Sequence, residues 1–290
     1  MKTAAVLAFS ASLFAQGAYS WGAMGHATVA YIASNYMNGA AKTFVSHILD
    51  GATPASVASW ADTYRYTAAG RFSAGFHYID AHDTVPHSCN IDLERDCGAE
   101  GCVVYAIANY TERVQMTNLT AIERTDALKF IIHFLGDITQ PLHTENLDVG
   151  GNDITVQWGE GSKSKTNLHA IWDRQIPETL AGGSTDAVAE KFAKAIVKDI
   201  ESGIYKDQKD SWVSCDSITK GAACPKVWAA DANSFVCTVV LPNGVDAVQG
   251  TDLSTEYYEK AAPIARQQLA KGGYRLGMWL NSIAAAVNSR

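Results

Sequence analysis

The feature that most constrains the fold is an apolar stretch, residues 124–138, that carries a histidine and an aspartate four positions apart. Because apolar side chains fill most of its positions, the sequence predicts a helix that is buried on nearly every side and stopped by Pro141. His133 and Asp137 then project from one face of that helix. An unpaired charge there would be costly, so the pair needs a partner, and a metal ion is the simplest one.

The rest of the chain also favours helices. Apolar residues recur with helical spacing in three further segments, residues 26–36, 185–202 and 256–287. The last of these is expected to form two helical stretches around Gly272-Gly273. Alternation typical of a strand is confined to residues 154–158. We therefore expect an all-α fold, a single mainly helical domain with at most a small β-hairpin.

The first twenty residues have the composition of an export signal. Lys2 precedes an apolar run at 4–14, and small residues follow at 16–20. The run is too short to span a bilayer as a helix. Cleavage after Ser20 would leave Trp21 at the N-terminus of a single domain, residues 21–290. We expect a secreted, extracellular protein that makes no membrane contact.

The cysteines agree with an exported protein. They are Cys89, Cys97, Cys102, Cys215, Cys224 and Cys237. Six cysteines allow fifteen pairings, so their number alone does not fix the connectivity, and some free buried thiols remain an alternative. Cys97 and Cys102 enclose a short glycine-rich loop and are expected to pair. Asn109 and Asn118 begin acceptor sequences for N-linked glycans, Asn109-Tyr110-Thr111 and Asn118-Leu119-Thr120.

The formal net charge of −7 argues against an electrostatic clamp on duplex DNA. It does not argue against a nuclease, because bound metal ions would add positive charge where a phosphate must sit.

Histidines and aspartates occur close together at several places in the chain. His169 and Asp173 repeat the spacing of His133 and Asp137. Imidazole and carboxylate are suitable zinc ligands, and two of them at positions i and i+4 bind one ion without straining a helix. One such pair is as easily a buried ion pair, whereas two pairs with nearby satellites favour a metal site. The satellites are His26, Asp62, His77, Asp80 and His143.

These residues lie in motifs that resemble the fungal S1/P1 nuclease family. The motifs are Trp21-Gly22-Ala23-Met24-Gly25-His26, Ser59-Trp60-Ala61-Asp62, His77-Tyr78-Ile79-Asp80, the stretch 133–143, Asn167-Leu168-His169 with Trp172-Asp173, and the stretches 228–233 and 271–276. The resemblance covers essentially the whole mature chain. It implies a mainly helical fold of the phospholipase C/P1 nuclease type and three zinc ions. It also implies hydrolysis of single-stranded DNA and RNA to 5′-phosphate products, with 3′-nucleotidase activity.

The resemblance implies a ligand set. One zinc of a close pair would be held by Asp62, His77, His133 and Asp137. Its neighbour would be held by Asp137 as a bridge, by His26, and by the α-amino nitrogen and carbonyl oxygen of Trp21. The third zinc would be held by His143, His169 and Asp173. An α-amino group has a pKa of roughly 7.7–8.0 and gives up its proton readily to a metal ion. Trp21 would have a free α-amino group only after signal cleavage, so export and activation would be coupled.

The resemblance also implies roles for residues near the metals. Asp62 would orient the attacking water as a general base, and Arg65 would stabilise charge on the phosphate. Tyr78 would stack on a base, Asp80 would hydrogen-bond to its edge, and Asn152 would lie nearby. Tyr78 replaces a phenylalanine of the relatives and Thr144 replaces an acid, which leaves base preference and the tuning of the third zinc open.

The disulfides implied by the resemblance are Cys97–Cys102 and Cys89–Cys237, which leaves Cys215 and Cys224 for a local bridge.

Two other functions remain open from the sequence. A zinc phospholipase C would share the fold, the three zincs and the N-terminal tryptophan, although Tyr78 and Asp80 favour the nuclease. A secreted zinc-binding protein without activity is the other, but the third site has only three protein ligands, and structural zinc usually has four. We expect a monomer without an obligate protein partner that acts on single-stranded nucleic acids and mononucleotides.

Overall fold

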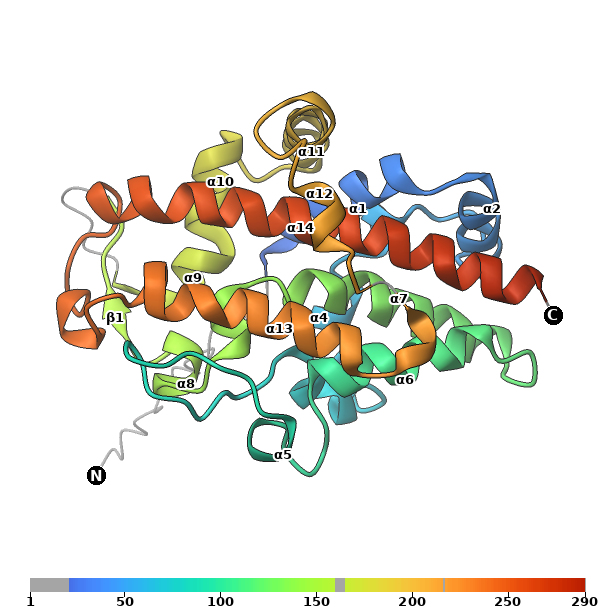
Figure 1. The fold of residues 1–290 in the computed structure, drawn as a ribbon, viewed down its shortest axis with the longest axis horizontal. Helices are drawn as coiled ribbons and strands as arrows, with labels where there is room; N and C mark the ends of the chain where they lie inside the picture. The colour runs from blue at the N-terminus through green and yellow to red at the C-terminus, as the bar shows by residue number, and fades with distance from the viewer. Residues whose placement is uncertain (1–20, 160–164, 216, 290) are drawn as a thin grey trace, which may run out of the picture.

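The computed structural model describes residues 21–159, 165–215 and 217–289, and their fold is mainly helical (Figure 1). The proposed signal peptide, residues 1–20, lies outside the described residues. The α-helices are α1 (Ala23–Tyr36), α2 (Gly39–Ile48), α3 (Pro54–Val57), α4 (Trp60–Tyr64), α5 (Leu93–Asp96), α6 (Val103–Gln115), α7 (Ala121–Asp137), α8 (Asp148–Gly151), α9 (Leu168–Ala170), α10 (Ile176–Ala181), α11 (Asp186–Ser202), α12 (Lys209–Trp212), α13 (Ala223–Phe235) and α14 (Glu256–Asn288). The tighter 3₁₀ turns are η1 (Arg71–His77), η2 (Pro141–Thr144), η4 (Ile218–Lys220) and η6 (Val245–Ala247), and the wider π turns are η3 (Ile171–Gln175) and η5 (Val236–Val240).

Helix α7 is the predicted central helix. It begins with a capping box, in which the Thr120 hydroxyl accepts from the Glu123 N–H and the Glu123 carboxylate accepts from the Thr120 N–H. From Ala127 onward most of its side chains are buried, against α6, α14, α1 and α2. His133 and Asp137 therefore lie in the interior, with no exposed surface.

Helix α14 is continuous, so the expectation of two helical stretches around Gly272-Gly273 is wrong. These glycines do not break the helix; they let α1 approach it closely. A Cβ on Gly273 would lie 2.4 Å from Cβ of Ile32, and one on Gly277 would lie 2.7 Å from Cβ of Tyr36. Figure 1 shows α14 running along the molecule with α13 beside it. The close packing of α14 on α1 fixes the helix that carries His26.

The only strands among the described residues form a small antiparallel pair, β1 (Thr155–Val156) and β2 (Thr166–Asn167). This agrees with the expected small hairpin. No helix in the described part of the chain is both long enough and apolar enough to cross a membrane.

All six cysteines are in disulfides. The bonds join Cys89 to Cys237, Cys97 to Cys102, and Cys215 to Cys224. The first of these ties the loop after Asp80 to η5, across 148 residues of sequence.

Candidate metal centre

Four segments bring histidines and aspartates together in the interior, and we call this set the paired group. Its members are His26 on α1, Asp62 on α4, His77 at the end of η1, and His133 and Asp137 on α7. Each is at most 3% exposed. Residues far apart in sequence thus meet where water is largely excluded.

Asp137 lies between two sets of imidazoles. Its Oδ1 is 3.2 Å from Nε2 of His26, while its Oδ2 is 3.0 Å from Nδ1 of His77 and 3.3 Å from Nε2 of His133. Asp62 Oδ1 approaches the same side, 3.5 Å from Nε2 of His133. A carboxylate whose two oxygens face different imidazoles has the arrangement needed to bridge two ions.

The protonation of the paired group is set by burial. Burial and the neighbouring His133 lower the pKa of His26, and burial with His133 does the same for His77, so both rings are neutral. Burial would also lower the pKa of His133, but Asp137 and Asp62 raise it above its usual value. Burial raises the pKa of Asp137. The metal-free group therefore retains a proton shared among buried ligands, which a metal ion would displace.

Gly136 makes room for one of these rings. A Cβ there would lie 2.8 Å from Nδ1 and 3.0 Å from Cε1 of His26. The His26 ring also stacks on His133, with ring centroids 3.9 Å apart. Glycine is therefore required one residue before Asp137.

The start of the described chain is anchored between α7 and η3. The Trp21 side chain is fully buried, and its indole N–H donates to the Thr139 hydroxyl at 3.2 Å. The next residue, Gly22, donates its backbone N–H to the carbonyl oxygen of Asp173 at 2.7 Å. These contacts fix the position of Trp21 just before α1, the helix that carries His26.

A second cluster, which we call the third group, consists of His143 on η2, His169 on α9 and Asp173 on η3. Nε2 of His169 is 3.1 Å from Nε2 of His143 and 3.2 Å from Oδ2 of Asp173. His143 Nδ1 donates to the carbonyl oxygen of His77, and His169 Nδ1 donates to that of Gly150, both at 2.7 Å. Because a carbonyl only accepts, each Nδ1 carries a proton, so Nε2 is the nitrogen of each ring that can bind a metal ion. Burial and the neighbouring His169 lower the pKa of His143, whereas Asp173 raises the pKa of His169 above its usual value despite burial.

Two imidazole nitrogens and a carboxylate oxygen this close together need either a proton or a metal ion among them. Zinc–nitrogen bonds of 2.0–2.1 Å in a tetrahedral site place the nitrogens about 3.3 Å apart, close to the separation seen here. The donor set of the third group therefore fits a zinc ion. It also leaves one position of such an ion without a protein ligand.

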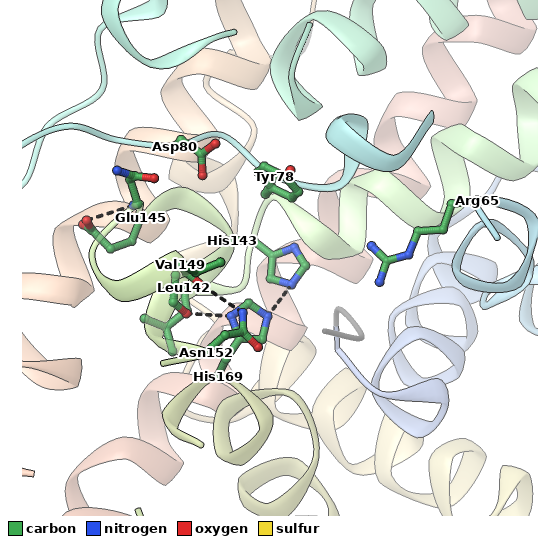
Figure 2. Close-up of a pocket in the computed structure, with 11 residues that line it drawn as sticks. Arg65, Tyr78, Asp80, Leu142, His143, Glu145, Val149, Asn152 and His169 are labelled. Atoms are coloured by element: carbon green, nitrogen blue, oxygen red, sulfur yellow. Dashed lines mark hydrogen bonds between the residues drawn. The ribbon is translucent and has the colours of Figure 1, made fainter. Parts of the chain in front are cut away.

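His143 and His169 of the third group line a cavity of about 200 Å³ (Figure 2). Its lining includes every residue expected to contact substrate, namely Arg65, Tyr78, Asp80 and Asn152. Arg65 extends toward the histidines from the side opposite Asp80. Burial raises the pKa of Asp80 and of Tyr78. The sequence-predicted pocket residues thus share one cavity with His143 and His169.

Five further residues line this cavity and were not predicted as site residues from the sequence: Leu142, Glu145, Asn146, Val149 and Gly150. Val149 is 63% exposed and has φ 58°, a left-handed conformation that is strained for a β-branched residue. Burial raises the pKa of Glu145 to about 7. The adjacent Gly150-Gly151 signals a turn, but nothing in the sequence indicates which side chains that turn directs into the cavity.

Thr144, the departure beside His143, is fully buried and has a clear role in this chain. Its hydroxyl donates to the Pro141 carbonyl at 2.7 Å, and its own carbonyl accepts from the Asn233 amide at 2.8 Å. These bonds hold η2 in place. Because the His77 carbonyl already orients His143, that ring needs no neighbouring acid as a hydrogen-bond partner.

Comparison with known proteins agrees with this geometry. The family model described as S1/P1 Nuclease matches residues 21–285. The chain is 47% identical to Nuclease PA3 from Penicillium sp and to Nuclease P1 from Penicillium citrinum, in each case over 91% of this chain and 97% of the relative. It is 46% identical to Nuclease S1 from Aspergillus oryzae, over 93% of this chain and 94% of the relative. On this match, which spans nearly all of the described residues, the chain belongs to the S1/P1 nuclease family.

Proposed function

We propose that this chain is a secreted, zinc-dependent endonuclease that hydrolyses single-stranded DNA and RNA to 5′-phosphate products and also removes 3′-phosphates from mononucleotides. The observation that carries the zinc dependence is the third group, where two imidazole nitrogens and a carboxylate oxygen converge on one point. Nuclease activity follows from membership of the family. The three zinc ions and the role of each residue are the proposal.

We take the ligand assignment from the family resemblance, and the contacts within each group support it for the histidines and aspartates. Asp62, His77, His133 and Asp137 would hold one zinc, and Asp137, His26 and the α-amino nitrogen and carbonyl oxygen of Trp21 a second. His143, His169 and Asp173 would hold the third. Bound zinc would supply Lewis-acid chemistry, activating water and neutralising charge on the phosphate and the leaving oxygen.

Two side chains near these ligands would act on the reacting phosphate. Asp62 would orient the attacking water and accept its proton. It approaches the His133 side of the paired group, where only one of its oxygens is close to an imidazole. Arg65 lies one helical turn later on the rim of the cavity, and its guanidinium would stabilise negative charge on the phosphate.

Single-strand preference follows from the depth of the ligands. Groups that are at most 5% exposed lie too deep for the backbone of a stacked duplex to reach. An unpaired base can enter the cavity and stack on Tyr78. The edge of that base can then form hydrogen bonds with Asp80 and Asn152. We add Val149, whose exposed side chain would form another wall of the base site.

Several features of the whole chain belong to the same proposal. Residues 1–20 would be a signal peptide and residues 21–290 one nuclease domain. Three disulfides support an oxidising compartment outside the cell. Asn109 and Asn118 are both exposed, so both can carry glycans. The protein would act as a monomer, with no membrane and no obligate protein partner.

The test is hydrolysis of heat-denatured DNA and of RNA by chain beginning at Trp21, with and without a zinc chelator. We expect acid-soluble nucleotides whose release stops with chelator and returns with zinc. No release from a zinc-loaded protein between mildly acidic and neutral pH would refute the proposal. Hydrolysis of phosphatidylcholine instead would indicate a zinc phospholipase C, and no turnover of either substrate a metal-binding protein.

A further inference from the structure

Gln140 lies in the interior between the two metal-binding groups, and its side chain is bonded at both ends. It has no exposed surface. Its Nε2 donates to Oδ1 of Asp173 at 2.6 Å, and its Oε1 accepts from the backbone N–H of Leu142 at 2.6 Å. Because a backbone N–H only donates, the second bond fixes which end of the amide faces Asp173. Gln140 therefore presents a donor to that carboxylate.

The backbone of Gln140 connects the same two groups. Its N–H donates to the carbonyl of Asp137 at 2.9 Å, and its carbonyl accepts from the N–H of His143 at 3.0 Å. The side chain is thus held at the junction between the end of α7 and η2. Because both its backbone and its side chain are held, Gln140 can fix the orientation of the Asp173 carboxylate.

The two oxygens of Asp173 have different surroundings. Oδ1 is occupied by the Gln140 amide, whereas Oδ2 faces Nε2 of His169 at 3.2 Å. Nε2 of His143 is 3.9 Å from Oδ1. Of the two oxygens, only Oδ2 is both close to a ring nitrogen and outside the bond to Gln140.

We propose that Gln140 is a positioning residue that restricts Asp173 to binding metal through Oδ2 alone. The inference rests on the proposed function, since it assumes a zinc ion at the third group. With Oδ1 held by the amide, the protein supplies three ligand atoms, and the ion keeps an open position for a substrate oxygen. Without the amide, the carboxylate can turn and bind through both oxygens, which fills that position.

The chain contains a matched control. Gln268 is also fully buried, and its Nε2 donates to the carbonyl of Thr139, the residue just before Gln140, at 2.8 Å. Replacing Gln268 removes a buried amide from the same region without removing a bond to Asp173. Any effect of general destabilisation should appear in both variants.

The test compares zinc-loaded crystal structures and kinetics of the mature wild type, Gln140→Leu and Gln268→Leu. In the wild type we expect one Asp173 oxygen at about 2.0–2.2 Å from the metal and the other on Gln140. In Gln140→Leu we expect both oxygens on the metal, unchanged zinc content, and a kcat about 10- to 100-fold lower. Gln268→Leu should keep the wild-type coordination and kcat.

Gln140→Met is a second variant if Gln140→Leu does not fold, because methionine matches the length of glutamine and has no donor for Asp173. The same two-oxygen binding is expected. One-oxygen binding in the Gln140 variants, or two-oxygen binding in the wild type, would overturn the inference. A wild-type chain in which the third group binds no metal would overturn the proposed function itself, which separates the two failures.

Discussion

The metal-binding groups and the nucleotide cavity are built in contrasting ways. The candidate ligands of the two groups are at most 5% exposed, and His133, His143 and His169 are each held by a backbone carbonyl. In the cavity, Tyr78 is 39% and Val149 63% exposed, and Val149 belongs to a turn of successive positive-φ residues. Ligands must be fixed before metal binds, whereas a base site must remain open to solvent.

This contrast separates two kinds of effect. Changes in the metal-binding groups should alter kcat and zinc binding for every substrate alike. Changes in the cavity should alter KM and base preference while zinc binding is retained.

The largest effect is expected from Asp62→Asn. The amide cannot accept the proton of the attacking water, so kcat should fall by about 10²- to 10⁴-fold on DNA and RNA alike. Asp207→Asn is the control, because Asp207 is exposed on the surface. Initial rates with denatured DNA and with RNA test this. A loss confined to one of the two substrates would contradict a role in the shared chemistry.

Gly136→Ala should damage the paired group through packing. The new methyl group would lie 2.8 Å from Nδ1 of His26, and relieving that overlap should cost about 1–3 kcal/mol of unfolding free energy. Zinc affinity should fall as well, because His26 must move. Gly39→Ala, at a site with no atom within 4 Å of the added Cβ, is the matched control. Thermal unfolding with and without zinc would measure both effects, and equal behaviour of the two variants would contradict the argument.

Much of the metal-binding region could be predicted because its signals are local. The spacing of His133 and Asp137 is visible within one short stretch of sequence, together with its apolar surroundings. The spacing of His169 and Asp173 is visible within another. The resemblance then joined these pairs to His26, Asp62 and His77, which no local pattern connects. The structure brings His26, Asp62 and His77 together with the first pair, and it places His143 beside the second.

The errors and omissions have a different physical origin, because they depend on tertiary contacts. Gly272-Gly273 indicates a break by propensity alone, yet α14 runs through both residues, and the missing side chain of Gly273 leaves room for Ile32 of α1. Val149 lines the cavity from the turn at 148–151, whose residues adopt positive φ, a conformation unfavourable for valine. Propensity rules predict a helix break at Gly272-Gly273 and a negative φ at Val149, and the structure has neither.

In the cavity, Tyr78→Ala should raise KM with little change in kcat. Base stacking on an aromatic ring contributes about 1–3 kcal/mol, which corresponds to about a 5- to 150-fold weaker binding of substrate. Tyr78→Phe keeps the ring and should remain close to wild type. Tyr105, which is 47% exposed on α6 and does not line the cavity, provides the control Tyr105→Ala. A zinc content that falls together with affinity would contradict the separation of the two regions.

The smallest effect expected is the pH dependence of zinc binding. Despite burial, Asp137 and Asp62 raise the pKa of His133, so the metal-free paired group carries a proton at neutral pH. Zinc must displace that proton, and lowering the pH strengthens the competitor, so affinity should fall by about tenfold per pH unit for each proton released. Competition with a chelator of known affinity, from about pH 5.5 to about pH 7.5, would measure how zinc affinity changes with pH. An affinity independent of pH would mean that the ligands are already deprotonated, and the buried proton inferred for this group would be absent.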